Sequence, residues 1–336
     1  MKFRIAVLGA TGFIGSPYRR EIRDCPDDAT IVSLCGRRLE LLKAAAVEDG
    51  AEYFTNDWEE AISDDGVNLV LVCTPDSLHH EAIMACAERG LHVVCEKPPG
   101  VTAAEANQMW NAYRDRQPGH FVPLWTRYVD VFRKAREICA AGQLGPIRAF
   151  VYRWHNPRPV AMPFTWRDDA VLSSAGSIGD VGSHAYDALR WILGDETKRV
   201  LTHADVVSPA KPDLGDINLG EAIAWGSEHN SPPATKRRKG SAYDYASISI
   251  DRVSGDVRLY RNDVDPETVA TLPEAHHRNR FNQFAFPGLR DRIDGRPSEH
   301  PGLDDGYRVQ LFTEAAARSA RDGHWIDLSQ VENQLT

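Results

Sequence analysis

Hydrophobic residues in the first 125 positions of the chain fall into short continuous runs, and longer stretches with helical periodicity separate these runs. The runs predict buried strands at Phe3–Leu8, Thr30–Leu34, Leu69–Cys73, Leu91–Cys95 and His120–Leu124. The stretches between them predict helices at Phe13–Asp24, Leu39–Glu48, Ser77–Arg89 and Ala103–Arg116. Apolar strands that alternate with helices are typical of a parallel sheet covered on both faces. Residues 1–125 are therefore predicted to form a doubly wound α/β domain.

The pattern changes from about residue 126 onward. It predicts, in order, a helix over Tyr128–Ala141, a strand over Ile147–Trp154, a helix over about Val181–Leu193, strands over Ala246–Arg252 and Asp256–Tyr260, and a helix over Gly306–Arg321. Residues 126–336 are therefore predicted to form an α+β domain with a large, mainly antiparallel open sheet. The last helix has a broad apolar face, which suits packing at the junction between the two domains.

One long polar stretch and the overall charge limit the choice of partners. The stretch Ser208–Ser241 is rich in proline, glycine and charge, and we interpret it as a long loop. Its basic run, Lys236-Arg237-Arg238-Lys239, is better explained as a solvated turn than as a nucleic-acid patch. The net charge of −9 also disfavours nucleic acid or an anionic membrane as the main partner.

Composition indicates a soluble, cytoplasmic protein. No stretch approaches the roughly 20 apolar residues of a membrane span, and the start of the chain runs into a strand without the pattern of a signal peptide. The six cysteines show no close-paired spacing, and Cys35, Cys73 and Cys95 end predicted strands, where a thiol acts as a small hydrophobic group. A reducing compartment fits this usage best.

A glycine-rich turn joins the first predicted strand to the first helix, and it reads Gly9-Ala10-Thr11-Gly12-Phe13-Ile14-Gly15. Glycine is needed in such a turn because a β-carbon would block the approach of the backbone to a pyrophosphate, which then meets unpaired amides at the helix N-terminus. We interpret the turn as the dinucleotide-binding turn of a Rossmann domain, with Thr11, Phe13 and Ile14 beside the three glycines as contact residues. The alternative is a glycine turn that binds no ligand.

The end of the second strand bears on the choice of cofactor. A carboxylate there would accept hydrogen bonds from the ribose 2′-hydroxyl of NAD and would repel the 2′-phosphate of NADP. This chain has Cys35-Gly36-Arg37-Arg38 instead, with two guanidinium groups suited to binding a phosphate. The sequence therefore favours NADP(H), with NAD(H) as the other possibility. The alternative for Arg37 and Arg38 is that both are simply solvated residues in the first turn of a helix and bind no cofactor.

Two distant motifs carry candidate catalytic residues. Glu96-Lys97-Pro98 follows the fifth strand, at the edge where open α/β sheets bind ligands, and Lys97 there could stabilise a developing alkoxide. Asp180 and His184 are four residues apart, so a helix would place both on one face, and a histidine near a carboxylate can act as a general base. Taken singly, such a lysine is commonly solvated and such a pair is commonly a local helix contact.

Combined with further motifs, these residues resemble the glucose-fructose oxidoreductase, inositol dehydrogenase and MocA (Gfo/Idh/MocA) family. The motifs that carry the resemblance are the glycine-rich turn, Thr74-Pro75-Asp76 with His79, Glu96-Lys97-Pro98, Arg127-Tyr128, Gly142-Gln143-Leu144-Gly145-Pro146-Ile147, Gly179-Asp180-Val181-Gly182-Ser183-His184 with Asp187, Asp304-Asp305-Gly306 and Ala315-Ala316-Ala317. They run over nearly the whole chain. Pro99-Gly100 departs from the family's usual continuation after Lys-Pro, which leaves the substrate open.

The resemblance implies hydride transfer between a nicotinamide cofactor and a secondary hydroxyl or ketone of a sugar, cyclitol or related polyol. Lys97 would bridge substrate and nicotinamide, Asp180 would bind the substrate hydroxyl, and His184 would exchange the proton. The residues that would line the cofactor cleft are Thr74, Pro75, His79, Glu96 and Lys97. The open sheet of the second domain would serve oligomerisation, as a homodimer or homotetramer.

Some alternatives stay open at this point. The family resemblance also allows an enzyme that retains NAD(P) and cleaves a glycoside through transient oxidation of the sugar, and a dinucleotide-binding regulator without catalysis is a third possibility. Trp154, His155 and Arg167 are equally suited to lining a substrate pocket or to ordinary packing. The histidine pairs His79-His80 and His276-His277 lack the spacing of metal ligands, so no metal is predicted.

Overall fold

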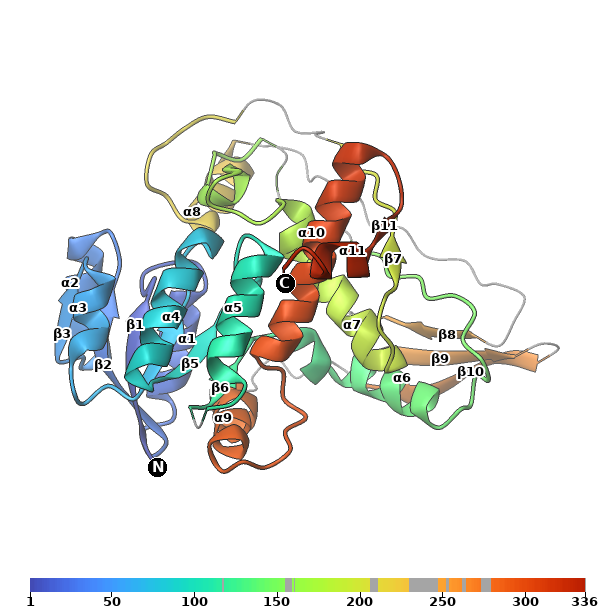
Figure 1. Cartoon of the computed structure of the whole chain (residues 1–336), viewed down its shortest axis with the longest axis horizontal. Coiled ribbons are helices and arrows are strands. Elements are labelled where there is room, and N and C mark those ends of the chain that lie inside the picture. Colours follow the sequence, from blue (N-terminus) through green and yellow to red (C-terminus); the bar gives the residue numbers. More distant parts are fainter. Residues whose placement is uncertain are drawn as a thin grey trace.

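The computed structural model describes residues 1–116, 118–154, 159, 161–205, 211–229, 247–251, 254–261, 264–272 and 279–335 (Figure 1). Its N-terminal part is built on a six-stranded parallel sheet with the order β3-β2-β1-β4-β5-β6. The strands are β1 (Phe3–Leu8), β2 (Ala29–Cys35), β3 (Tyr53–Thr55), β4 (Leu69–Val72), β5 (His92–Cys95) and β6 (His120–Phe121). This is the strand order of the Rossmann fold. The prediction of a doubly wound α/β domain is therefore confirmed.

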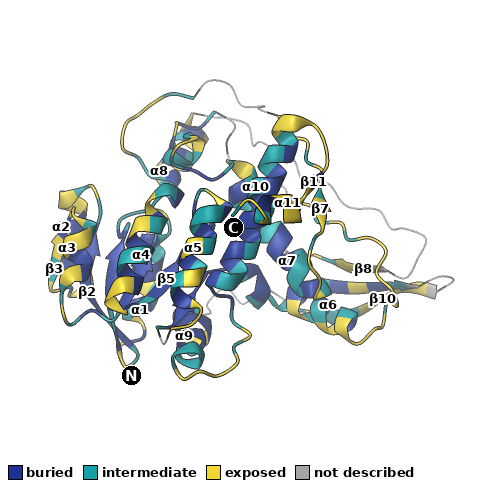
Figure 2. Cartoon of the chain, in the orientation of Figure 1, coloured by how far each residue is buried: buried dark blue, intermediate teal, exposed yellow. Residues whose placement is uncertain are grey.

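Helices cover both faces of this sheet. One face carries α3 (Trp58–Ser63), α4 (His79–Arg89) and α5 (Ala103–Tyr113), and the other carries α1 (Gly15–Arg23) and α2 (Leu39–Asp49). The central strands are buried on both sides, as Figure 2 shows, which is why their sequences are continuous apolar runs. The sequence did not reveal β3 and α3, because elements of three and six residues are too short for a periodic pattern to show.

A helix from the last third of the chain completes this core. The π-turn η5 (Phe281–Ala285) leads into α9 (Phe286–Ile293), which packs on the same face as α1 and α2. The ring of Phe286 stacks on that of Phe3, with 5.0 Å between their centroids. The chain thus returns to its first sheet after forming the elements of the second part.

The second part of the chain combines helices with short antiparallel sheets. Its elements are α6 (Asp130–Ala140), the π-turn η4 (Ile178–Gly182), α7 (Ser183–Leu193), β7 (Arg199–Val200), α8 (Leu219–Glu228), β8 (Ser247–Ile250), β9 (Asp256–Arg261), β10 (Val264–Thr271), α10 (Leu303–Asp322), β11 (Ile326–Asp327) and α11 (Leu328–Glu332). In the described residues β10-β9-β8 form one antiparallel sheet, and β11-β7 form a separate two-stranded ladder. The antiparallel α+β class is confirmed. The sheet seen in these ranges has three strands and is smaller than the sequence suggested.

The strand predicted over Ile147–Trp154 is wrong. The backbone there is irregular and follows the 3-10 turn η2 (Trp125–Tyr128) and helix α6 as a connecting segment. Its aromatic side chains hold it in place, because Tyr152 stacks on Phe132 and on Trp154, with centroid distances of 6.0 and 6.2 Å. Most of the segment is exposed, so water can bind the backbone groups that a strand would have paired.

The stretch Ser208–Ser241 is not simply a loop, because α8 lies within it. Asn218 caps this helix by accepting the Glu221 backbone N–H at 3.1 Å, and the Glu221 carboxylate accepts the Asn218 backbone N–H at 2.7 Å. This reciprocal arrangement is a capping box. The basic run Lys236-Arg237-Arg238-Lys239 lies outside the described residues.

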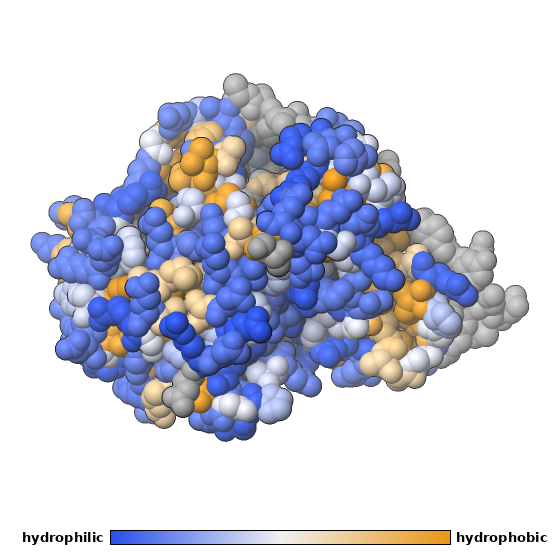
Figure 3. Space-filling model, in the orientation of Figure 1, coloured by the Kyte–Doolittle hydropathy of each residue, from blue (hydrophilic) through white to orange (hydrophobic). Residues whose placement is uncertain are grey.

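The long helix α10 lies between α5 of the first domain and α7 of the second (Figure 1). The face of the molecule in Figure 3 is mostly hydrophilic, with small hydrophobic groups near α8 and at the end that carries α6. No helix in the described ranges combines the length and the apolar character needed to cross a membrane.

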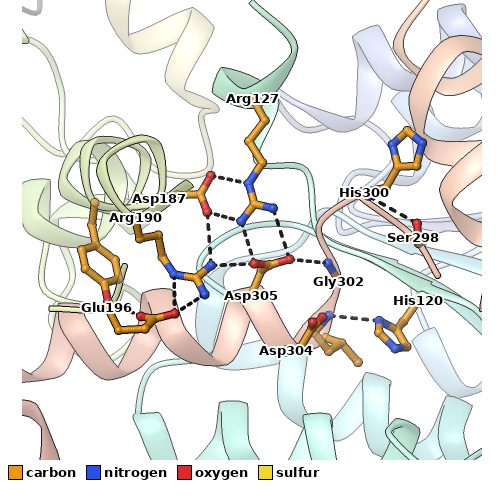
Figure 4. A network of polar contacts seen from close by, with 12 residues as sticks. His120, Arg127, Asp187, Arg190, Glu196, Ser298, His300, Gly302, Asp304 and Asp305 are labelled. Atoms are coloured by element: carbon orange, nitrogen blue, oxygen red, sulfur yellow. Dashed lines mark hydrogen bonds and ion pairs between the residues drawn. The ribbon is translucent and has the colours of Figure 1, made fainter. Parts of the chain in front are cut away.

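A buried ion-pair network joins η2, α7 and α10 (Figure 4). Arg127 of η2 donates to both carboxylate oxygens of Asp187 on α7, at 2.9 and 2.6 Å. It also donates to Asp305 of α10, at 2.6 and 3.4 Å, and Arg190 reaches the same carboxylate at 2.6 Å. Because bidentate Arg–carboxylate pairs are directional, the network sets how α7 and α10 meet the end of the first domain.

Candidate active site

The glycine-rich turn between β1 and α1 is packed so tightly that two of its positions require glycine. Gly9 has a φ of +78°, and a β-carbon there would lie 2.5 Å from the carbonyl oxygen of Cys73. A β-carbon on Gly15 would lie 2.3 Å from the carbonyl oxygen of Gly9. A side chain at either position would clash with backbone, which cannot move aside easily. These glycines let the turn fold back across the end of β4.

The surroundings of this turn fit a dinucleotide. Helix α1 starts after Ile14 without a side-chain cap and without an acidic residue in its first turn, so the positive end of its dipole carries no counter-charge of its own and suits an anion. The buried hydroxyl of Thr74, which lies beside Gly9, has no hydrogen-bond partner among the described residues. Phe13 is 43% exposed at the mouth of the turn, and Thr11 lies beside Gly36 at the end of β2.

The structure places Arg37 and Arg38 at the end of β2, in ion pairs with the second part of the chain. Arg37 pairs with the carboxylate of Asp216 and is 73% exposed. Arg38 donates to both oxygens of Glu221, at 3.1 and 3.3 Å. The two guanidinium groups lie where the sequence predicted them, but they have carboxylate partners that the sequence did not reveal.

Glu96 is fixed at the end of β5 by a buried aromatic group. Its carboxylate accepts a hydrogen bond from the Tyr18 hydroxyl and another, at 3.2 Å, from the backbone N–H of Lys97. Trp125 donates its indole N–H to the Tyr18 oxygen at 2.6 Å. Burial and the neighbouring Glu96 charge raise the pKa of Tyr18 well above its usual value, so the phenol stays protonated as a donor. Glu96 thus points into the protein and holds the backbone that carries Lys97.

Lys97 and Asp180, which are 83 positions apart, meet between the two domains. The ammonium group of Lys97 donates to the backbone oxygen of Asp180 at 2.7 Å and to its carboxylate at 3.0 Å. Arg167 donates to the same carboxylate oxygen at 3.3 Å. The Lys97 side chain is only 8% exposed, so its charge is balanced by this carboxylate rather than by bulk water.

Asp180 lies in a π-turn and not in a regular helix, which differs from the helical spacing assumed from the sequence. The turn η4 spans Ile178–Gly182, and α7 with His184 follows it. The backbone is tightly folded at this point, since a β-carbon on Gly179 would lie 1.8 Å from the carbonyl oxygen of Ser174, and Ala175 has a φ of +55°. Such turns and positive φ values at non-glycine residues occur often at functional sites.

His184 occupies the first turn of α7. Its ring is stacked on Trp154, with a centroid distance of 5.8 Å and an interplanar angle of 12°. Trp154 therefore lines the site beside the candidate base, and Arg167 reaches it through Asp180. His155 lies outside the described residues. From the sequence, Trp154 and Arg167 were equally suited to lining a substrate pocket or to ordinary packing. In the structure they contact His184 and Asp180, respectively.

His79 is fully buried and links two loops of the site. Its ring nitrogens lie 2.9 Å from the Thr74 carbonyl oxygen and 3.1 Å from that of Pro98. Burial lowers the pKa of His79, so the neutral ring donates to one carbonyl at a time. This position suits a residue that holds the Thr74-Pro75 loop against the Lys97-Pro98 turn rather than one that contacts the cofactor. The Lys97–Pro98 peptide bond is cis.

Asp76 is a buried carboxyl group of the Thr74-Pro75-Asp76 motif, to which the sequence analysis gave no role of its own. Its side chain accepts the backbone N–H of Ser174 at 2.8 Å and so ties the loop before η4 to the first domain. Burial raises the pKa of Asp76 to about 6. The raised pKa means that folding favours the protonated carboxyl, and this contribution to stability is lost as the pH rises through about 6.

We expect Asp76→Asn to stabilise the protein more at pH 8 than at pH 4.5, because asparagine keeps an acceptor for the Ser174 N–H and carries no charge. The pKa difference corresponds to at most about 3 kcal/mol at the higher pH. Thermal unfolding of wild type and variant at both pH values measures this, with the exposed Asp65→Asn as the control. A stability difference that does not change with pH would contradict the assignment.

Within the residues that the structure describes, no group of three or more His, Cys, Asp or Glu side chains is arranged to hold a metal ion.

Comparison with known proteins shows the family. Residues 3–122 match the model of the oxidoreductase family with an NAD-binding Rossmann fold, and residues 132–264 match the Gfo/Idh/MocA C-terminal domain. The levoglucosan dehydrogenase of Pseudarthrobacter phenanthrenivorans is 32% identical over 87% of this chain and 88% of its own. The myo-inositol 2-dehydrogenase of Thermotoga maritima is 26% identical over 98% of this chain and 99% of its own.

Solved structures show the same fold over the whole length. An oxidoreductase domain protein from Kribbella flavida superposes with a TM-score of 0.78 at 23% identity, and it covers 98% of this chain and 99% of its own. A levoglucosan dehydrogenase in complex with NADH and levoglucosan superposes with a TM-score of 0.76 at 22% identity, over 98% of this chain and all of its own. As the resemblance implied, the chain belongs to the Gfo/Idh/MocA family of NAD(P)-dependent oxidoreductases.

Proposed function

We propose that the protein transfers a hydride between NADP(H) and a secondary hydroxyl or ketone of a sugar, cyclitol or related polyol. The observation that carries this proposal is the contact of Lys97 with Asp180. This contact holds a buried ammonium group just after β5, at the same edge of the parallel sheet as the glycine-rich turn after β1. Ligands of open α/β sheets bind at this edge.

In the proposed reaction, Lys97, His184 and Asp180 have separate roles at the carbon that is oxidised or reduced. Among the described residues Lys97 uses two N–H donors on Asp180, so its third donor can bind the substrate oxygen and stabilise the alkoxide as it forms. His184 takes the hydroxyl proton on an imidazole nitrogen during oxidation and returns it during reduction. Asp180 keeps the ammonium group in place and binds the substrate hydroxyl. The bound nicotinamide supplies the hydride acceptor or donor.

The names of relatives support a polyol as the substrate class. Besides the two dehydrogenases above, the chain is 28% identical to the D-glucoside 3-dehydrogenase of Escherichia coli over 97% of each chain. These names describe dehydrogenation of sugars and cyclitols in those proteins. A stacked pair such as Trp154 and His184 also offers an apolar face with a polar edge, which suits a sugar ring.

A panel of sugars, cyclitols and their keto forms, assayed by nicotinamide absorbance with each cofactor, tests the proposed reaction. We expect at least one polyol to reduce the cofactor in a substrate-dependent manner. Release of a sugar from a glycoside without net change in absorbance would support the cofactor-retaining cleavage instead. Failure of every polyol and keto sugar would contradict the substrate class.

NADP(H) is the proposed cofactor because no carboxylate lies within Cys35-Gly36-Arg37-Arg38 and two guanidinium groups do. We expect wild type to bind NADPH more tightly than NADH, and Arg37→Ala to lose roughly tenfold to a hundredfold in NADPH affinity by removing a charge-assisted contact. Fluorescence titration of both dinucleotides measures this. Arg321→Ala, which removes an arginine of similar 70% exposure at the end of α10, is the control. Equal or tighter binding of NADH by wild type would overturn the preference.

We also propose a cytoplasmic homo-oligomer, a homodimer or homotetramer that associates through the antiparallel sheet. All six cysteines are free thiols, which suits a reducing compartment. The end of the molecule that holds α6 and the sheet carries one of the hydrophobic groups seen in Figure 3, and Val151 there is 65% exposed. Exposed apolar side chains of this kind favour burial against another copy.

A further inference from the structure

The start of α8 reaches from the second part of the chain to the cofactor cradle of the first domain. Figure 1 shows α8 above the end of the molecule that holds α1, α2 and α4. Gly220, in its first turn, lies against the ring of Phe13, because a β-carbon on Gly220 would be 3.2 Å from the ring. Asp216 and Glu221 at the same end pair with Arg37 and Arg38. We call residues 216–221 the acidic arm.

Packing and a capping box position the acidic arm in addition to its ion pairs. Leu219 and Ala222 are buried, and the capping box between Asn218 and Glu221 fixes the first turn of the helix. The backbone oxygen of Asp216 accepts a further, long hydrogen bond of 3.5 Å from Arg38. The two carboxylates therefore face the arginines because the helix is held there. We expect the helix to stay in place when these charges are removed, because glutamine at position 221 keeps an acceptor for the Asn218 N–H.

The carboxylates of the acidic arm form ion pairs with the guanidinium groups that a 2′-phosphate would need. The end of β2 is where a Rossmann domain meets the ribose 2′ position, and phosphate binding there uses guanidinium donors. An NADP(H) molecule has to displace Asp216 and Glu221 or bind beside two negative charges. NAD(H) carries no charge at that position, so it leaves both ion pairs intact.

We propose that Asp216 and Glu221 set the cofactor preference of this protein by competing with the 2′-phosphate of NADP(H) for Arg37 and Arg38. This assignment rests on the proposed function, since it needs a dinucleotide in the cradle of the glycine-rich turn. It places two specificity-determining residues in the second part of the chain, about 180 positions from the strand that usually decides the preference. The arginines alone give the attraction for phosphate, and the arm reduces it.

The test is the affinity of the full-length protein for NADPH and NADH when the arm is neutral. In Asp216→Asn/Glu221→Gln the helix keeps its cap acceptor, and the arginines lose their competitors. Two surface ion pairs together amount to roughly threefold to thirtyfold in affinity. We therefore expect NADPH to bind about tenfold more tightly, with less than a twofold change for NADH.

Two controls make the result specific. Glu228→Gln removes one charge from the other, exposed end of α8 and should leave both affinities unchanged. In an Arg37→Ala/Arg38→Ala background the neutral arm should change NADPH affinity far less, because no guanidinium group is left for which the carboxylates and the phosphate compete. Thermal unfolding of each variant shows that the fold is kept.

The possible failures are distinguishable. If wild type binds neither dinucleotide, the proposed function is wrong and this proposal falls with it. If wild type binds both and the neutral arm changes NADPH affinity by less than twofold, the proposal alone is wrong. An equal gain for NADPH and NADH would also overturn it, because it would show general repulsion of the pyrophosphate rather than competition at the 2′ position.

Discussion

Replacing Lys97 with methionine is expected to lower turnover by about a hundredfold to ten-thousandfold while NADPH still binds, because the variant loses the donor that stabilises the developing alkoxide. Methionine fills a similar volume, but it cannot make the two hydrogen bonds of 2.7 and 3.0 Å to Asp180. The Asp180 carboxylate would then keep Arg167 as a cationic partner, at 3.3 Å. The loss should therefore appear in kcat and not in cofactor affinity.

His184→Ala should show a loss of the same order, because the hydroxyl proton then has no imidazole to accept it. Turnover with an identified polyol and NADPH affinity, measured side by side, give the result. Lys134→Met removes a half-buried lysine that pairs with Glu137, serves as the matched control and should keep wild-type turnover. If Lys97→Met or His184→Ala stays within threefold of wild type, the role proposed for that residue is wrong.

Arg127→Met is expected to destabilise the fold by about 3–5 kcal/mol, because it leaves a buried carboxylate without its partner. Asp187 is 0% exposed, and Arg127 covers both of its oxygens. Arg190 is the remaining cation nearby, at 3.9 Å from Asp187 and already bound to Asp305. Urea unfolding followed by fluorescence and by circular dichroism measures the change in the free energy of unfolding.

Two further variants separate the buried charge from the lost packing. Adding Asp187→Leu to Arg127→Met should recover much of the stability, since an apolar pair of similar volume can replace a buried ion pair. Arg296→Met breaks an exposed cluster with Asp291 and Asp294, and it should cost less than about 1 kcal/mol. A loss below that figure for Arg127→Met would show that the network of Figure 4 does not hold the junction.

Sequence and structure agree best where a physical requirement is local. The strand Phe3–Leu8 was predicted with its observed bounds, because a strand buried on both faces is apolar at nearly every position and only Arg4 interrupts the run. The glycine-rich turn was recognisable for a similar reason, since only glycine fits at positions 9 and 15 whatever the rest of the fold does. The motif Glu96-Lys97-Pro98 could be placed because it directly follows a strand of this kind.

Two predictions from the sequence, for the region of α8 and for the segment Ile147–Trp154, were wrong for different reasons. Helix α8 was taken for part of a loop because its neighbourhood is polar and rich in proline and glycine. Its capping box, Asn218 with Glu221, and the apolar residues that follow could have revealed it. The segment Ile147–Trp154 has the composition of a strand, but composition does not say whether a neighbouring strand is available to pair with it.

The sequence by itself determined the class of the first domain, the position of the dinucleotide turn and the family, because each can be recognised from short motifs whose residues are close together in the chain. Only the tertiary structure decided which distant groups meet. It brought Lys97 to Asp180 through a π-turn, returned α9 to the first sheet, and paired Arg37 and Arg38 with an arm about 180 residues away. These contacts depend on how whole elements pack. The local sequence around a side chain at the end of a strand does not identify the distant residue that packing brings into contact with it.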